Sequence, residues 1–353
     1  MKAEEFIKGR GAQYNPVNPY MKQEYVAEHI EGLDEAMVSN SKTEFFTEHP
    51  KKIVNKVESP DIGLSYSLNP YQGCEHGCVY CYARNTHQYW GYGAGLDFER
   101  KIIVKENAPQ VLAKQLENKN WQVMPLMLAG NTDCYQPIEA KKKLTRQILE
   151  VLLQYRHPVS IITKNALILR DLDLLTELNK LDLLHVNISI TTLEEKLRLK
   201  LEPRTASGAK RLEVVRQLRS ADIPVNVMVA PVIPGLNDSE IPQIIKKAAD
   251  AGAQNAAYTI VRLNGSIGPI FEDWIKEAFP DRAEKVLHQI ADCHGGQLND
   301  SRFGTRMRGE GKFADAIGKL FRLSKQKYMA GRSIKPFNYT HFCSRSGKQL
   351  NLF

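Results

Sequence analysis

Three cysteines lie within eight residues of this chain, at Cys74, Cys78 and Cys81 in the stretch NPYQGCEHGCVYCYAR. Their spacing is C-x3-C-x2-C, and no fourth cysteine follows nearby. Thiolates are ligands of zinc and of iron–sulfur clusters, but a structural zinc normally takes four protein ligands. Three thiolates on a four-iron cube would leave one iron open to chelate a small molecule. The triplet therefore favours an iron–sulfur cluster with a free position.

A zinc site is the main alternative for this triplet. Its fourth ligand would be His76 or one of the distant cysteines Cys134, Cys293 and Cys343. His76 lies inside the same tight loop, where a histidine is poorly placed to complete a tetrahedron. Cys293 and Cys343 are far from each other and from the loop in sequence, so we predict no second cluster.

Composition and charge place the protein in a broad class. The chain has 353 residues, of which 42% are hydrophobic and 25% charged, as in soluble globular proteins. The first residues resemble no secretory signal and the longest apolar runs are too short for a bilayer, so we expect a cytoplasmic protein with reduced thiols and no membrane partner. A net charge of +8 suits a polyanion such as DNA, and it equally suits ordinary solubility.

Short apolar runs rich in β-branched residues alternate with helical patterns from about residue 64 onward. The runs are GLSYSLNP, directly before the cysteine loop, and residues 124–130, 159–164, 184–192, 224–235 and 255–263. About six strand–helix units indicate a parallel α/β sheet that is buried on both faces. A doubly wound sheet is an alternative, but polar residues follow several strands, as at the mouth of a barrel. We therefore predict a partial (β/α)6 TIM-like barrel.

Four segments are expected along the chain. Residues 1–60 are polar with little periodicity and are interpreted as an N-terminal arm or cap that contributes no core element and is the candidate lid of the barrel. Residues 61–265 form the barrel. Residues 266–343 carry helical patterns without intervening strands, and residues 344–353 form an exposed tail.

The cysteine spacing and its place after the first strand resemble the radical S-adenosylmethionine (radical SAM) superfamily. The resemblance implies a [4Fe-4S] cluster on Cys74, Cys78 and Cys81, with SAM bound to the open iron and Tyr80 near its adenine. It also implies reductive cleavage of SAM, after which a 5′-deoxyadenosyl radical removes a hydrogen atom from the substrate. The electron would come from a donor such as a flavodoxin or ferredoxin.

From about residue 60 to residue 265, the chain resembles the spore photolyase-like branch of this superfamily. Within that branch it resembles bacterial proteins whose substrate is undefined. The matching segments are AGNTDCYQP, ITKN, NISITT, LEPRTAS and VAPVIPGLND. They imply SAM contacts from Gly130, Asn131, Thr132, Asp133, Lys164, Ser189, Arg204, Pro231 and Ile233. Structural roles are the alternatives: a solvated Lys164, a satisfied buried Ser189, a helix cap at Thr132 and Asp133, and an ion pair of Arg204 with a helix carboxylate.

Spore photolyases return a hydrogen atom to their product from a cysteine. In this chain that cysteine aligns near Gly130, which puts repair of a thymine dimer in doubt. Cys134 and Tyr135 lie a few residues further on and are the candidates for a relayed hydrogen transfer. The alternative for Cys134 is a small buried apolar residue.

The chain ends in QLNLF, in which Gln349, Leu350, Leu352 and Phe353 surround Asn351. This ending resembles the short peptides by which bacterial polymerases and repair proteins bind the replication sliding clamp. A tail folded back onto its own helices is the alternative. With the basic charge and the photolyase-like barrel, the motif favours a function in DNA repair or nucleic-acid modification. A protein or small-molecule substrate, and a non-catalytic iron–sulfur DNA-binding module, are the other interpretations.

Overall fold

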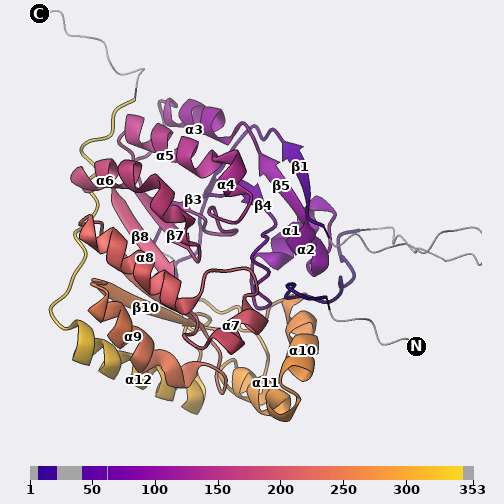
Figure 1. Cartoon of the computed structure of the whole chain (residues 1–353). Helices are drawn as coiled ribbons and strands as arrows, with labels where there is room; N and C mark the ends of the chain where they lie inside the picture. Colours follow the sequence, from indigo (N-terminus) through magenta and orange to yellow (C-terminus); the bar gives the residue numbers. More distant parts are fainter. Residues whose placement is uncertain (1–6, 22–41, 62, 345–353) are drawn as a thin grey trace, which may run out of the picture.

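A computed structural model describes residues 7–21, 42–61 and 63–344 of the chain (Figure 1). Its main sheet has seven strands in the order β10-β9-β8-β7-β6-β3-β2. Six of them are parallel: β3 (Tyr66–Leu68), β6 (Leu126–Leu128), β7 (Val159–Thr163), β8 (Leu184–Ser189), β9 (Val225–Val232) and β10 (Asn255–Ile260). The seventh, β2 (Val54–Lys56), is antiparallel to β3. The predicted α/β fold with six parallel strands and an open edge is confirmed.

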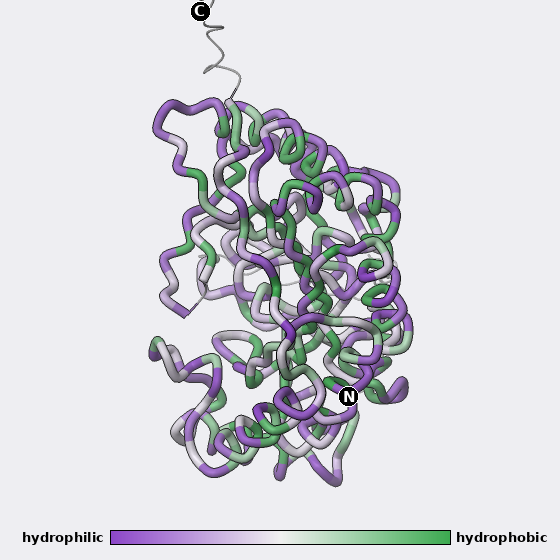
Figure 2. The backbone as a smooth tube through the Cα atoms, turned by 90° about the vertical axis from the view of Figure 1, so that its left-hand side faces the viewer, coloured by the Kyte–Doolittle hydropathy of each residue, from purple (hydrophilic) through white to green (hydrophobic). Residues whose placement is uncertain are grey.

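Helices cover the outer face of the curved sheet (Figure 1). They are α3 (Ala108–Leu116), α4 (Glu139–Lys142), α5 (Leu144–Gln154), η2 (Ala166–Asp171), α6 (Leu172–Lys180), α7 (Glu195–Leu201), α8 (Gly208–Ser220), η3 (Asp238–Glu240) and α9 (Ile241–Asp250). Their amphipathic sequences explain the packing. In α9, Ile241, Ile244, Ile245 and Ala248 recur at helical spacing and are all buried. Figure 2 shows the resulting alternation of hydrophobic and hydrophilic residues along the outer helices.

A smaller sheet lies beside the barrel and carries the cysteine loop. It consists of β1 (Glu44–Glu48), β5 (Lys101–Lys105) and β4 (Tyr71–Gln72), in that order. Three short helices, α1 (Arg84–His87), η1 (Gln88–Trp90) and α2 (Leu96–Arg100), connect the cysteine loop to β5.

The expectation that residues 1–60 contribute no core element was wrong. Strands β1 and β2 lie in this region, and the side chains of Ile53 and Val54 are buried in the main core. Both strands are too short to show an alternating pattern, so they could not be predicted from the sequence. Residues 7–21 pack behind the cysteine loop, and no described residue before Val57 lines the cavity described below. The lid therefore stays a prediction, since residues 1–6 and 22–41 of the arm lie outside the described residues.

After β10 the chain forms α10 (Ile267–Ala278), η4 (Pro280–Arg282), α11 (Ala283–Asp292) and α12 (Gly311–Met329). Residues 330–344 then run along the barrel as an extended segment (Figure 1). The amide of Asn338 donates to the carbonyl of Asp182, and that of Cys343 to the carbonyl of Tyr155. Both acceptors precede strands, so this segment crosses the amino-terminal end of the barrel. No helix in the described ranges has the length and apolar character needed to cross a membrane.

The open side of the sheet, between β2 and β10, is spanned by two loops. The carboxylate of Asp61 accepts hydrogen bonds from the Gly304 amide and from the Arg306 side chain. The loop that carries Gly304 and Arg306 also contacts β10, because the amide of Ile260 donates to the carbonyl of Met307. These contacts join the two edges of the partial barrel, and the segments that make them reach the central cavity.

Candidate active site

A cavity of about 370 Å³ lies at the carboxyl ends of the parallel strands. In barrels of this type, functional side chains gather at this end because each strand delivers its next residues there. Ten sequence-predicted site residues line it together: Cys74, Cys78, Tyr80, Cys81, Gly130, Asn131, Thr132, Asp133, Lys164 and Ser189. Pro231, at the end of β9, is the eleventh.

The three thiols of the cysteine loop share one wall of this cavity. Cys74 and Cys78 are buried, Cys81 is partly buried, and all three are free of disulfides. Burial raises the pKa of each thiol, to about 12 for Cys78, and the neighbouring sulfurs raise the pKa of Cys74 further. Three adjacent thiolates are therefore unfavourable here unless a cation binds them. An iron–sulfur cluster provides such a cation, so the donor set fits one.

The tight loop depends on Gly77, whose backbone has φ +68. A Cβ at this position would lie 2.7 Å from the carboxylate of Glu99, so any other residue would be both strained and crowded. The amide of Gly77 donates to the carbonyl of Cys74 and closes this turn, and the amide of Cys81 donates to the carbonyl of Cys78 in the next one.

The alternative of a zinc ion finds no complete ligand set among the described residues. His76 is buried with both ring nitrogens occupied, Nδ1 at 3.4 Å from the Asp133 carboxylate and Nε2 at 3.3 Å from the Asn165 amide. Cys293 does not line the cavity, and the Cys343 thiol lies against the Gln154 carbonyl. Within the described ranges, no three His, Cys, Asp or Glu side chains are grouped to hold a single ion. In a four-iron cluster each thiolate binds a different iron, so the ligands need not converge on one point.

A buried ion pair that the sequence did not reveal supports the loop from behind. Arg84 and Glu99 are fully buried, with 2.5 Å between Nη2 and Oε1. Arg84 also donates to the carbonyl of Cys78, and Glu99 accepts from the amides of Gly11 and Ala12. Residues 7–21 thus stabilise the metal-binding loop through Glu99. Only the position of Arg84, three residues after Cys81, hinted at this role.

The turn after β6 positions two other elements through Asp133. Its carboxylate accepts hydrogen bonds from the Thr163 hydroxyl, the Lys164 amide and the Tyr135 amide. The predicted alternative of a helix cap was wrong, because α4 begins only at Glu139 and Ile138 occupies its N-cap position. Asp133 instead joins the ends of β6 and β7 beside His76.

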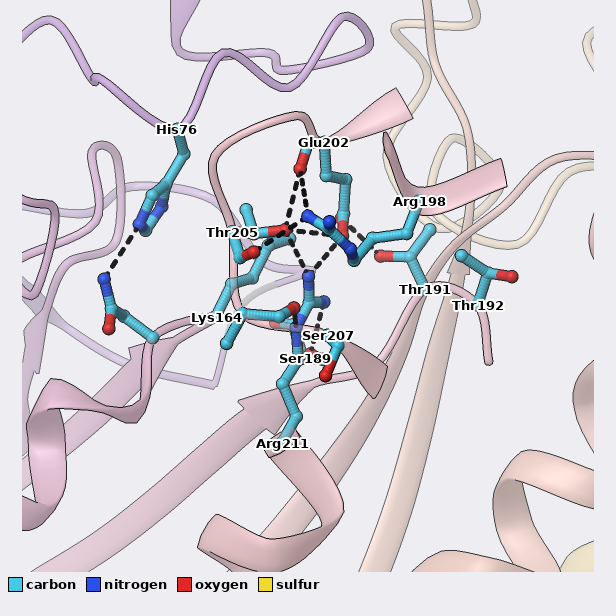
Figure 3. A network of polar contacts seen from close by, with 12 residues as sticks. His76, Lys164, Ser189, Thr191, Thr192, Arg198, Glu202, Thr205, Ser207 and Arg211 are labelled. Carbon is cyan, nitrogen blue, oxygen red and sulfur yellow. Dashed lines mark hydrogen bonds and ion pairs between the residues drawn. The ribbon is translucent and has the colours of Figure 1, made fainter. Parts of the chain in front are cut away.

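Glu202 lies at the centre of a buried polar network (Figure 3). Its carboxylate accepts from Arg211 at 2.5 Å, from Thr191 at 2.7 Å and from the hydroxyl of Tyr80. Burial alone would raise the pKa of Glu202, but the charges of Arg211 and Lys164 outweigh it and lower this pKa to about 2. The network therefore contains an ionised carboxylate at neutral pH.

Lys164 is the cation that faces the cavity next to the thiols. Burial lowers its pKa, but Cys78 and Glu202 more than compensate, so the net pKa is raised and the side chain is protonated. Its Nζ lies 6.0 Å from the centre of the Tyr80 ring. Arg211 donates to the carbonyl of Ser189 and so fixes the end of β8 in the same wall.

Two residues predicted to contact SAM do not line the cavity. Arg204 is exposed, and its Nε donates to the carbonyl of Gly9. Arg211, in the first turn of α8, pairs with Glu202 instead. Ile233 is buried in a hydrophobic cluster, where its amide donates to Asn237.

The two candidates for hydrogen transfer also lie outside the cavity. Cys134 and Tyr135 are fully buried, and the Tyr135 hydroxyl donates to Asp171 on the far side of the turn. Cys134 packs in the main core, in agreement with its alternative as a small apolar residue. Tyr82 lines the cavity in their place, half exposed, with its hydroxyl bonded to the carbonyl of Gly130.

Comparison with known proteins identifies the family of this chain. The model of the Radical SAM superfamily matches residues 68–248. The chain belongs to the radical SAM superfamily. An uncharacterized protein of Methanocaldococcus jannaschii is 34% identical over 253 residues, which cover 71% of this chain and 90% of the relative. One of Mycobacterium tuberculosis is 34% identical over 234 residues, or 65% and 69% of the two chains.

Among solved structures, the chain resembles a spore photoproduct lyase variant with bound AdoMet and dinucleoside spore photoproduct. The TM-score is 0.57 at 16% identity, over 83% of this chain and 82% of the other. At this identity the similarity shows a shared fold.

Membership in the superfamily implies an iron–sulfur cluster and SAM, and the cavity fits both. Cys74, Cys78 and Cys81 would hold the cluster. Tyr80 and the protonated Lys164 border the adjacent space, together with the other lining residues of the strand ends. A cation beside a ligand carboxylate is the kind of contact that SAM requires.

Proposed function

We propose that this protein is a radical SAM enzyme that acts on nucleic acid, in DNA repair or base modification. The observation that carries the proposal is the composition of the cavity beyond the thiols. The cavity is also lined by the apolar side chains of Val57, Leu64, Met127, Met228 and Met307, and by Arg262 and Arg306. Apolar side chains and guanidinium groups suit a base and its phosphate.

Two further observations support a nucleic-acid substrate. A protein of the same fold binds a dinucleoside spore photoproduct. The net charge of +8 favours a polyanion at long range.

The residues of this chain have separable roles in the proposed reaction. The cluster and SAM, when bound, supply one-electron chemistry that removes a hydrogen atom from the substrate. Cys74, Cys78 and Cys81 hold the cluster, and Lys164 supplies positive charge beside it. The cavity walls exclude water and orient the substrate, which limits side reactions of a reactive centre.

The decisive experiment is anaerobic reconstitution of the enzyme, followed by SAM cleavage with and without intact or damaged DNA. We expect DNA to stimulate cleavage, and deuterium from labelled DNA to appear in 5′-deoxyadenosine. Cleavage that DNA does not affect, but that a protein or small molecule stimulates, would assign the enzyme to another substrate class. Reconstituted protein that binds iron but never cleaves SAM would instead indicate a non-catalytic DNA-binding module.

We also propose that the C-terminal tail binds the bacterial sliding clamp and that a flavodoxin or ferredoxin supplies the electron. Gln349, Leu350, Leu352 and Phe353 lie outside the described residues. The last described segment crosses the amino-terminal end of the barrel, so docking there would leave the cavity accessible. A peptide of residues 344–353 should bind purified clamp at micromolar strength, and removal of Leu352 and Phe353 should abolish binding. A peptide that binds equally well without them would refute this docking.

A further inference from the structure

Arg262 is a cavity arginine that forms no ion pair with any residue in the described part of the chain. It lies two residues after β10, at the carboxyl end of the last strand, and is half buried. Its neighbours fix the backbone, since the Val261 amide donates to Val232 and the Leu263 amide to Leu298. The side chain lines the cavity, and no hydrogen bond or ion pair to another described residue accounts for its guanidinium.

Arg262 is not the only arginine without an ion pair, since Nε and Nη2 of Arg100 are buried without a partner, but Arg100 does not line the cavity. Several other buried or partly buried arginines have carboxylate partners. Arg84 pairs with Glu99, Arg211 with Glu202 and Arg306 with Asp61. Burial, and then the nearby charge of Arg306, lower the pKa of Arg262, and the opposing charges of Tyr82, Asp61 and Asp300 do not reverse this shift. Asp61 and Asp300 form ion pairs with Arg306 and Arg302, so Arg262 has no ion-pair partner of its own, and an anionic ligand in the cavity would supply one.

We propose that Arg262 binds a phosphodiester of the target nucleic acid and so positions the adjoining nucleotide in the cavity. The inference rests on the proposed function and names the contact that the substrate makes. Guanidinium groups bind phosphate oxygens through two parallel hydrogen bonds. The base would then face the apolar side chains of Met127, Ile162 and Met228, which line the same cavity. Arg306 is less suited to this role, because Asp61 and Ser59 already accept from its Nε and Nη2.

The test compares two probes that differ only in charge, a dithymidine with a phosphodiester and the same compound with a neutral methylphosphonate. Binding to the anaerobically reconstituted enzyme is measured by calorimetry for the wild type, Arg262→Gln and Arg262→Lys. Arg308→Gln is the matched control, since Arg308 is exposed, lies outside the cavity lining and carries the same charge.

We expect the wild type to bind the phosphodiester about 10- to 100-fold more tightly than the methylphosphonate, as for a charge-assisted hydrogen bond. Arg262→Gln should abolish this preference and leave methylphosphonate binding unchanged, whereas Arg262→Lys should retain part of it and Arg308→Gln all of it. Without ligand, Arg262→Gln should melt at the same temperature as the wild type or higher, because it removes a charge that has no ion-pair partner. A lower melting temperature would show a structural role and overturn the proposal.

The remaining outcomes separate this inference from the proposed function. If both probes bind equally to the wild type, or if Arg262→Gln keeps the preference, Arg262 does not bind the phosphodiester although nucleic acid enters the cavity. If neither dithymidine binds, both proposals fail. If instead an acidic peptide binds in an Arg262-dependent manner, the arginine selects carboxylates and the substrate is a protein.

Discussion

Replacement of Glu202 by Gln tests whether a buried, ionised carboxylate organises the wall of the cavity. The substitution preserves the shape of the side chain but removes the charge that faces Arg211 and Lys164. Removing one partner of a buried ion pair typically costs about 3–5 kcal/mol, because the other charge is left unpaired. At neutral pH we therefore expect Glu202→Gln to lower the free energy of unfolding by about 3 kcal/mol.

The stability that Glu202 contributes should depend on pH in a defined direction. The pKa of Glu202 falls from the usual 4.5 to about 2 in the folded protein, so the ionised form stabilises the fold above 4.5. That stabilisation is lost as the pH falls from 4.5 towards 2. Between about pH 6 and pH 3 the wild type should lose about 2 kcal/mol through this group alone. The Glu202→Gln variant cannot lose it, so the gap between the two proteins should narrow to about 1 kcal/mol.

Urea denaturation of both proteins across this pH range measures the gap, since the other carboxylates titrate alike and cancel. Glu277→Gln, at an exposed position of α10, controls for the loss of one negative charge. Parallel loss of stability in the wild type and Glu202→Gln would refute the view that Arg211 and Lys164 keep Glu202 ionised.

Three other predictions follow from the geometry of the site. Cys81→Ser should abolish stoichiometric iron binding and the broad visible absorption of the reconstituted protein, whereas Cys134→Ser should retain both; equal losses would place Cys134 at the cluster. Glu99→Gln should lower the free energy of unfolding by about 3–5 kcal/mol in urea and also reduce iron loading, because Arg84 would lose its counter-ion beneath the cysteine loop. Lys164→Met should weaken SAM binding at least about tenfold in equilibrium dialysis with an unchanged circular dichroism spectrum, and unaltered affinity would exclude a SAM contact.

The strands of the barrel could be predicted because each buried parallel strand needs apolar residues on both faces. The prediction for residues 159–164 differs from β7 by one residue, and that for residues 184–192 begins with β8. Strands β1 and β2 could not be predicted, since short edge strands contain too few buried residues for a pattern. Pairing with distant partners, and not local sequence, stabilises them.

In the site, too, features set by local sequence could be predicted and features set by tertiary packing could not. The cysteine spacing and the turn after β6 are local, and the structure brings them together. The segment LEPRTAS suggests Arg204 by its resemblance to the family, whereas the ion pair of Glu202 uses Arg211 from the following helix. Cys134 has a suitable thiol, but the turn directs it into the core. Side-chain direction in an irregular segment depends on the packing around it, which one sequence does not display.

The positions of the cavity residues along the chain separate chemistry from substrate selection. The family match covers residues 68–248, which include the thiols, Lys164 and Ser189. Val57, Leu64, Arg262, Arg306 and Met307 lie outside that range, although all five line the same cavity. They belong to the segments near the open edge of the sheet, where Asp61 contacts Arg306. The residues that would hold the cluster therefore lie inside the family match, and we expect the segments outside it to contribute to substrate selection.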